Sequence, residues 1–437
     1  MTFAELKSLL FERTNFGVKL GLPRVKSALA LLGNPHLAAP ALHVAGTNGK
    51  GSTCAFAEAA LRAAGLRTGL YTSPHLLHFC ERIRLDGDPI SEERAAELLS
   101  TILARVPWAL AGGPAGRDDG DGLTFFELAT LIAFVAFAEA GVSAAVIEVG
   151  LGGRLDATNV VAPRACAVTS LGLEHMQYLG PTLASIAAEK AGIFKPGVPA
   201  VSALQEPEAA AVLERVAANV GAPLRFVEPL TLPLRLSLLG NYQRQNAAVA
   251  RALIEESGLP VTAAQLERGL ATARWPGRLE QASERPLVLL DGAHNPHAAR
   301  ALAATLPTIL AGRPLHLVFA AMVDKDAAAM LAVLAPLASS VHLCATANPR
   351  AARPEALAAA SALASPAASV ALGPEGKAVS AAPARAVHQS VRAALDAARS
   401  AAGRDGVVLC CGSLYLVGEV QALLSGSGPG PMPSERL

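Results

Sequence analysis

Short apolar runs rich in β-branched residues alternate with alanine- and leucine-rich stretches along almost the whole chain. This alternation is typical of βα units built around a parallel sheet with helices on both faces, so we predict an α/β fold. The predicted strands are Leu42–Ala45, Thr68–Tyr71, Ala145–Val149, Ala165–Thr169, Val198–Ser202, Leu287–Leu290, Leu315–Phe319, Val341–Cys344 and Val407–Cys410.

The predicted strands fall into two groups, and the segment 274–286 between them contains Pro276, Gly277 and Pro286 as chain breakers. A chain of 437 residues is also long for one compact core. We therefore expect a larger parallel-sheet domain over residues 1–280 and a smaller Rossmann-like α/β domain over residues 287–437. The loop 106–122 is expected to be solvated, the alanine-rich segment 356–386 fits surface helices as well as a linker, and the tail from Ser425 is expected to fray.

Charge and composition exclude several classes of partner. The chain has 37 Lys and Arg against 36 Asp and Glu, a net charge of +1, so it lacks the basic surface that holds nucleic acid. Hydrophobic residues make up 52% and charged ones 17%, which is typical of a folded protein. The apolar stretch 128–147 is interrupted by Glu139 and Gly141, and it predicts a buried helix followed by a strand rather than a membrane span.

The N-terminal residues and the cysteines point to the cytoplasm. Glu5, Lys7, Glu12 and Arg13 stand where a signal peptide would have its apolar centre. The six cysteines form no C-x-x-C pair, which favours buried thiols over disulfides or a zinc site. We expect a cytoplasmic monomer without a membrane partner.

The strongest local signal is the sequence GTNGKGS at residues 46–52, between a predicted strand and the helical run Thr53–Ala64. Glycines let backbone amides converge on an anion, the helix start adds partial positive charge, and Lys50 can reach the outer phosphates. The strict P-loop has one more glycine, where this chain has Val44. The alternative is a turn that only joins strand to helix. The predicted nucleotide contacts are Thr47, Asn48, Gly49, Lys50, Gly51 and Ser52.

Three polar residues lie at or just beyond the ends of predicted strands. Glu148 ends an otherwise apolar strand, and Ser73 and His175 follow two others, so all three are expected at one edge of the sheet. A carboxylate beside a phosphate loop suits Mg²⁺, whereas the alternative is a solvated glutamate at a strand end. Histidine alone more often has a structural role.

From residues 46–52 onwards, the chain resembles the folylpolyglutamate and dihydrofolate synthases of the Mur-ligase superfamily. The segments that carry this resemblance are Gly46–Ser52, Tyr71–Leu76, Glu81–Ile83, Ile147–Asn159, Glu189–Ile193, Trp275–Arg278, Asp291–Pro296 and Gly412–Tyr415. The resemblance implies an enzyme in which ATP converts a carboxylate into an acyl phosphate and the amine of L-glutamate then attacks it. The acceptor is dihydropteroate, the glutamyl tail of folate, or both.

The resemblance also implies roles for individual residues. Ser73, Glu148 and His175 match the family's magnesium ligands, although many members have Asp-His where this chain has Glu174-His175. Lys190 matches a lysine that is carbamylated in related enzymes and supports a second metal. Asn246, Arg278 and Asp291 match residues that contact ATP in the family. The catalytic candidates are Lys50 and Lys190, with His294 as a weaker third candidate. The other histidines show no metal spacing and are interpreted as structural: His36, His43, His78, His297, His316, His342 and His388.

Three other functions stay open from the residues. A monofunctional folylpolyglutamate synthase would use a single acceptor. A P-loop kinase or hydrolase would turn over ATP without glutamate. A regulatory nucleotide-binding module would lack metal ligands. Only 45 residues precede Gly46, too few for the additional N-terminal domain of the peptidoglycan ligases, so folate is the favoured substrate class.

Overall fold

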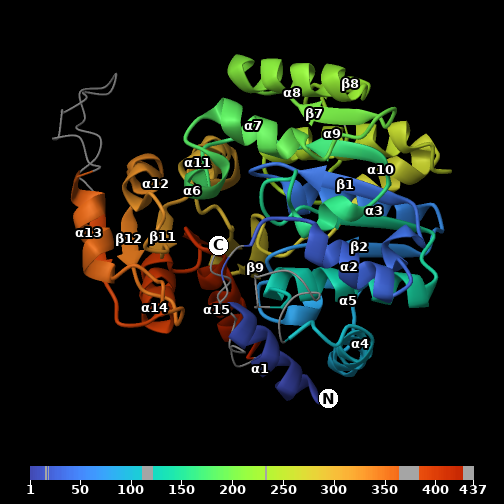
Figure 1. The fold of residues 1–437 in the computed structure, drawn as a ribbon. Coiled ribbons are helices and arrows are strands. Elements are labelled where there is room, and N and C mark those ends of the chain that lie inside the picture. Colours follow the sequence, from blue (N-terminus) through green and yellow to red (C-terminus); the bar gives the residue numbers. More distant parts are fainter. Residues whose placement is uncertain (15–16, 18, 111–121, 232–233, 364–382, 427–437) are drawn as a thin grey trace. The chain divides into compact units, whose positions relative to one another are not determined.

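The computed structural model describes residues 1–14, 17, 19–110, 122–231, 234–363 and 383–426 (Figure 1). These residues form two compact units. The first comprises residues 1–237 and 243–274. The second comprises residues 238–242 and the described residues from 275 to 426.

The first unit contains an eight-stranded sheet in the order β4-β3-β2-β5-β1-β6-β7-β8. The six strands from β2 to β8 in this order are parallel, and β3 and β4 add an antiparallel edge. All residues of β1 and β5 are buried, as expected for strands covered on both faces. The strands are β1 (Ala41–Ala45), β2 (Thr68–Tyr71), β3 (Ile83–Leu85), β4 (Asp88–Pro89), β5 (Ala144–Glu148), β6 (Pro163–Val168), β7 (Ala200–Ala203) and β8 (Leu224–Val227).

The helices of the first unit are α1 (Phe3–Thr14), α2 (Pro23–Leu31), α3 (Lys50–Ala63), α4 (Glu92–Arg105), α5 (Phe125–Ala140), α6 (Met176–Leu179), α7 (Leu183–Ala191), α8 (Pro207–Val220), α9 (Tyr242–Ser257) and α10 (Ala263–Thr272). Short 3-10 helices lie at Pro35–Leu37, Phe79–Arg82 and Ala157–Val160. Helix α5 begins with a capping box between Thr124 and Glu127 and ends at Gly141, so the stretch 128–147 is a buried helix followed by β5, as predicted. No helix among the described residues has the length and hydropathy needed to span a membrane.

The second unit contains a six-stranded sheet in the order β13-β12-β11-β14-β10-β9, in which only β9 is antiparallel to its neighbour. Its strands are β9 (Glu280–Glu284), β10 (Leu287–Leu290), β11 (Leu315–Phe319), β12 (Ser340–Leu343), β13 (Ala384–Val387) and β14 (Val407–Cys411). Its helices are α11 (Pro296–Leu310), α12 (Ala327–Leu334), α13 (Pro354–Leu363), α14 (Val391–Ala402) and α15 (Leu414–Ser425), with a 3-10 turn at Ala335–Leu337.

The α/β class is confirmed, and all nine predicted strands are present with ends within about two residues, the usual uncertainty of a helix or strand boundary. The sequence analysis missed the five short strands β3, β4, β8, β9 and β13, most of which have exposed or half-buried side chains and therefore no clear apolar signal. All six cysteines are free and buried, as expected. Residues 111–121, 364–382 and 427–437, which include most of the predicted loop, segment and tail, lie outside the described residues.

Candidate functional site

The predicted site residues of the first unit follow four neighbouring parallel strands. In the order β2, β5, β1 and β6, these strands lead to Ser73, Glu148, the loop 46–52 and His175. Because the carboxyl ends of parallel strands meet at one edge of a sheet, all of these groups lie at the edge where α/β proteins bind ligands.

The loop 46–52 leads directly into α3, which begins at Lys50 with Gly49 as its N-cap. The first amides of a helix have no partner inside the helix, and they carry its partial positive charge. The amides of Thr47 and Asn48 both donate to the carbonyl of Ser170 at 3.1 Å. Lys50 Nζ donates to the carbonyl of Thr47 at 3.2 Å, so the lysine side chain folds back onto the loop that precedes it. The start of α3 and this ammonium are the parts of the loop suited to a phosphate group.

Thr47 also joins the loop to the segment that carries His175. Its hydroxyl donates to the carbonyl of Gly172 at 3.1 Å and lies 3.2 Å from the amide of Gly172. His175 itself has φ of 53° and stands immediately before the short helix α6. One threonine side chain therefore fixes the loop after β1 against the loop after β6.

Ser73 and Glu148 are in direct contact. The amide of Ser73 donates to Glu148 Oε2 at 3.2 Å, and Glu148 is buried. The loop after Ser73 is shaped by Glu81, whose carboxylate accepts the amides of Leu76, Leu77 and His78 at 2.7–3.0 Å. The backbone on both sides of Ser73 is thus fixed by two carboxylates, those of Glu148 and Glu81.

The donor set at this edge fits a divalent cation. Glu148 offers a buried carboxylate, Ser73 a hydroxyl and His175 an imidazole, and hard cations such as Mg²⁺ prefer oxygen ligands and keep several waters or substrate oxygens. No group of three or more His, Cys, Asp or Glu side chains in the described part of the chain has a metal-binding arrangement. The predicted set has only two side chains of these types, so the remaining ligands would come from Ser73, water and substrate.

Lys190 lies next to the phosphate loop, although its residue type alone favours an exposed position. It is buried on α7, and its Nζ donates to the carbonyl of Gly46 at 2.7 Å. Burial, together with the charge of Lys50, lowers the pKa of Lys190 to about 7, and Glu174 and Asp156 oppose the shift. Lys190 therefore has a substantial neutral fraction near pH 7, and residue 174 contributes to the electrostatics of this site.

Asn246 contacts the loop from α9. Its side-chain amide donates to Gln243 Oε1 at 2.9 Å, and Gln243 Nε2 donates to the hydroxyl of Ser52 at 3.3 Å. The sequence analysis missed Gln243, which is completely buried. Its only signal in the sequence was its position three residues before Asn246, which places both side chains on one face of the helix.

Gly49 is a site where a side chain cannot be accommodated. Its φ is +94°, and a Cβ atom would lie 2.2 Å from Asn246 Oδ1. We expect Gly49→Ala to lower the free energy of unfolding by more than about 2 kcal/mol, through backbone strain and displacement of Asn246, and to raise KM for ATP. Urea denaturation and steady-state kinetics measure both effects.

Gly65 provides the matched control for this substitution. It also has a positive φ of +81°, but a Cβ atom added there would meet no other atom within 4 Å. Gly65→Ala should therefore cost only about 1 kcal/mol of backbone strain and leave KM for ATP unchanged. Equal effects of the two substitutions on KM would show that the contact with Asn246 does not shape the loop.

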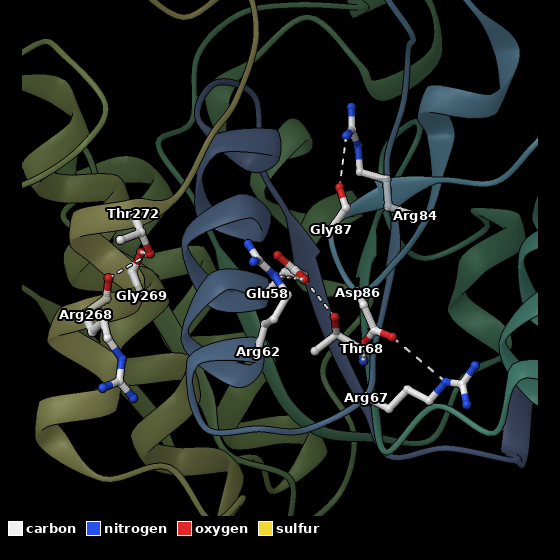
Figure 2. A network of polar contacts seen from close by, with 10 residues as sticks. All are labelled: Glu58, Arg62, Arg67, Thr68, Arg84, Asp86, Gly87, Arg268, Gly269 and Thr272. Carbon is white, nitrogen blue, oxygen red and sulfur yellow. Dashed lines mark hydrogen bonds and ion pairs between the residues drawn. The ribbon is translucent and has the colours of Figure 1, made fainter.

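Helix α3 is anchored at its other end by a buried carboxylate (Figure 2). Glu58 Oε1 accepts the hydroxyl of Thr68, the first residue of β2, at 2.7 Å and the Nε of Arg62 at 3.1 Å. The amide of Thr68 in turn donates to Asp86 at 2.8 Å. These bonds fix the helix that carries the phosphate loop to the strand that leads to Ser73.

In the second unit, Asp291 follows β10 and is surrounded by donors. Its Oδ2 accepts the hydroxyl of Tyr242 and the amide of Leu279, both at 2.9 Å, and its Oδ1 accepts the amide of Ala293 at 2.8 Å. Burial raises the pKa of Asp291, while the nearby charge of Arg278 opposes the shift. In this structure the carboxylate organises the turn after β10.

Arg278 and His294 lie near that turn. Arg278 Nη1 donates to the carbonyl of Gly277 at 3.1 Å, and a Cβ atom on Gly292 would lie 2.1 Å from the same nitrogen. His294 Nδ1 lies 2.7 Å from the carbonyl of Gly292. Since a carbonyl only accepts, the neutral His294 ring carries its proton on Nδ1. The structure thus groups Arg278, Asp291 and His294 in one place on the second unit.

Comparisons with known proteins agree with this arrangement. Residues 44–220 match the family model of the Mur ligase middle domain, and residues 277–414 match the Mur ligase glutamate ligase domain. The dihydrofolate synthase/folylpolyglutamate synthase of Bacillus subtilis is 39% identical over 377 residues, which cover 80% of this chain and 86% of the relative. The chain belongs to the Mur ligase family. Within this family it is a member of the folate branch, the dihydrofolate and folylpolyglutamate synthases.

Solved structures of the folate-branch Mur ligases have the same fold. The Escherichia coli FolC protein in complex with DHPP and ADP has a TM-score of 0.83 and 33% identity, covering 98% of both chains. The Yersinia pestis bifunctional folylpolyglutamate synthase/dihydrofolate synthase, complexed with AMPPNP and Mn ion, has a TM-score of 0.81 and 34% identity, covering 97% of this chain and 98% of that chain. The two-domain α/β fold expected from the resemblance is thereby confirmed.

Proposed function

We propose that this Mur ligase joins L-glutamate to a pteroyl acceptor at the expense of ATP, as a bifunctional dihydrofolate and folylpolyglutamate synthase. The observation that carries the proposal is the convergence of the phosphate loop, Ser73 and Glu148 at one sheet edge, in a member of a family whose solved structures hold ADP, AMPPNP and Mn ion.

The reaction has two steps. An oxygen of the acceptor carboxylate attacks the γ-phosphorus of ATP, the bond to ADP breaks, and an acyl phosphate forms. The amine of L-glutamate then attacks the acyl carbon, phosphate leaves with the bonding electrons, and the nitrogen loses a proton. The product is an amide.

The residues of the chain have distinct parts in the proposed reaction. The amides at the start of α3 and the Lys50 ammonium stabilise the charge on the transferred group. Ser73, Glu148 and His175 would hold Mg²⁺, which would neutralise phosphate charge. Arg278 and Asp291 as ATP contacts, and His294 as a catalytic group, stay predictions from the resemblance, as does the assignment of residues 1–280 to ATP and folate and 287–437 to glutamate ligation. A monomeric, cytoplasmic enzyme is part of the same proposal.

Carbamylation of Lys190 is a further part of the proposal, with a second metal ion beside it. Carbon dioxide reacts with a neutral amine, and a lysine pKa of about 7 provides that form at pH 8. The carbamate would replace a positive charge by a negative one beside the cations.

The modification can be measured directly. We expect the full chain, incubated with ¹³C-bicarbonate at pH 8, to show a carbamate carbon signal that weakens as the pH falls through about 7, because protonated lysine does not react. Lys190→Arg should lack the signal, and Lys195→Arg, which replaces a less buried lysine, should keep it. The assignment would be contradicted if the carbamate signal survived in Lys190→Arg. It would also be contradicted if the chain without substitutions showed no signal.

Two of the three alternatives to a bifunctional enzyme are tested by leaving out one substrate at a time. A monofunctional folylpolyglutamate synthase would release ADP with tetrahydrofolate but not with dihydropteroate. A P-loop kinase would release ADP in the absence of glutamate. The proposal requires ADP release with either acceptor and only when glutamate is present.

A further inference from the structure

A row of three imidazoles and one hydroxyl crosses the sheet of the second unit. His316 Nδ1 lies 2.8 Å from Ser340 Oγ, which lies 2.8 Å from His342 Nε2. His342 Nδ1 lies 3.0 Å from His388 Nε2, and the centroids of these two rings are 5.2 Å apart with an angle of 28° between the ring planes. The residues come from β11, from β12 and from the position just after β13. The row therefore links three adjacent strands.

The row lies opposite the aliphatic core of the second unit. Leu315, Leu317, Val341 and Leu343 belong to that core, so the alternating residues His316 and His342 point to the other face. Helix α14 packs there, against β11 and β12.

No counter-charge for the row is found among the described residues. The buried side chains of α14 are all apolar: Val391, Ala394, Leu395, Ala398 and Ala402. The charged residues of α14 are Arg392 and Asp396, which are exposed, and the half-buried Arg399. On β14, the residue in register with His316 is Val408 and the residue in register with Val318 is Cys410, so neither carries a charge. On β13, Arg385 is in register with Val341, which faces the opposite side of the sheet from the row.

Counting protons shows what the row can hold. Three hydrogen bonds need three donors, and the neutral row supplies them in either direction. One added proton on His342 keeps all three bonds, because His342 then donates on both sides, Ser340 donates to His316, and His388 accepts. A second added proton either sets two N–H groups against each other or leaves the hydroxyl proton of Ser340 without an acceptor in the row. It also places two positive charges in a buried region.

Strand β13 is joined to its neighbours by backbone and side-chain contacts. It is the edge strand of the sheet, and all four of its side chains are exposed or half-buried. Its contacts include the parallel backbone ladder to β12, extended by the amide of His388 donating to the carbonyl of Leu343 at 2.9 Å, the packing of α13 and the bond between His342 and His388.

We propose that the row of His316, Ser340, His342 and His388 is a pH-sensitive latch that holds β13 on the sheet at neutral pH and releases it when a second proton enters. The row would make the edge of the second unit open reversibly in acid while the rest of the sheet stays folded.

The electrostatics give the direction of this switch. Burial lowers the pKa of His342 to about 4, with His388 and His316 adding to the shift, and burial also lowers the pKa of His316. An imidazole released to solvent has a pKa of about 6.5, so the open form binds protons more readily than the closed one. The closed edge is therefore fully stable above about pH 6.5 and loses stability as the pH falls toward 4.

Hydrogen exchange measured by mass spectrometry on the full chain tests the latch. After correction for the chemical exchange rate, the opening constant of the β13 amides should rise by about tenfold or more between pH 7 and pH 5.5, since each proton taken up contributes up to about tenfold per pH unit. His388→Asn keeps a hydrogen-bonding side chain but does not titrate, and it should remove most of this rise. The control His36→Asn replaces a half-buried histidine of the first unit and should leave it intact.

Two results would overturn the proposal. One is an equal pH dependence of β13 opening in the original chain and in His388→Asn. The other needs no variant: ¹⁵N spectra of the histidine rings that show two protons added to the row while the β13 amides stay protected. Opening of β13 together with the second proton supports the latch.

Discussion

Replacement of Lys50 by alanine should reduce folate- and glutamate-dependent ADP release by about a thousandfold or more. The lysine is the cation placed at the phosphate loop, and loss of one preorganised group that stabilises transferring charge typically has an effect of this order. The loss should appear in kcat, because the charge on the transferred group is greatest in the transition state. Steady-state ADP release with saturating substrates measures it.

A lysine far from the loop gives the control. Lys7 lies on α1 against the ring of Phe3, and Lys7→Ala should keep the full rate. An unchanged kcat in Lys50→Ala would remove the loop 46–52 from the chemistry. A loss accompanied by a lower melting temperature would instead indicate that the loop had misfolded.

Replacement of Glu148 by glutamine should have the second-largest effect, a loss of about a hundredfold or more in activity, together with a higher Mg²⁺ concentration for half-maximal rate. Glutamine can still accept the amide of Ser73, so the loop after β2 should keep its position. The substitution therefore removes the negative charge while leaving the local hydrogen bond in place. Titration of activity with Mg²⁺ separates a weakened metal site from a general loss of folding.

Glu139 is the matched control for this charge removal. It is a partly exposed glutamate of α5 that pairs with Arg94, away from the sheet edge. Glu139→Gln should change neither the rate nor the Mg²⁺ requirement, because an exposed ion pair contributes little. A Glu148→Gln enzyme with an unchanged Mg²⁺ requirement would contradict the assignment of Glu148 as a metal ligand.

The fold could be predicted where apolar runs are long and bounded. The bounds of β2, β10 and β11 are as predicted, because each strand is a short, mostly apolar run that begins soon after a glycine or proline. Strand β13 could not be found in this way, since Ala384–Val387 follows an alanine-rich segment and none of its side chains is buried. Its position on the sheet depends on pairing with β12, which is a tertiary property.

The candidate site shows the same division. Ser73 and Glu148 were placed at one sheet edge because each follows a recognisable strand, and the structure has them in direct contact. The burial of Lys190 against Gly46 was not predictable from its residue type, because it results from the packing of α7 on the loop. His316, His342 and His388 have no informative spacing in the sequence, and only the parallel register of β11, β12 and β13 brings their rings together.

The most direct test of the account is an ADP-release assay with the full chain, ATP and Mg²⁺, in which glutamate, the pteroyl acceptor or both are left out. The account predicts rapid ADP release only when L-glutamate is present together with dihydropteroate or tetrahydrofolate, and formation of the corresponding amide in equal amount. Release of ADP at the same rate without glutamate, or without any pteroyl acceptor, would contradict it.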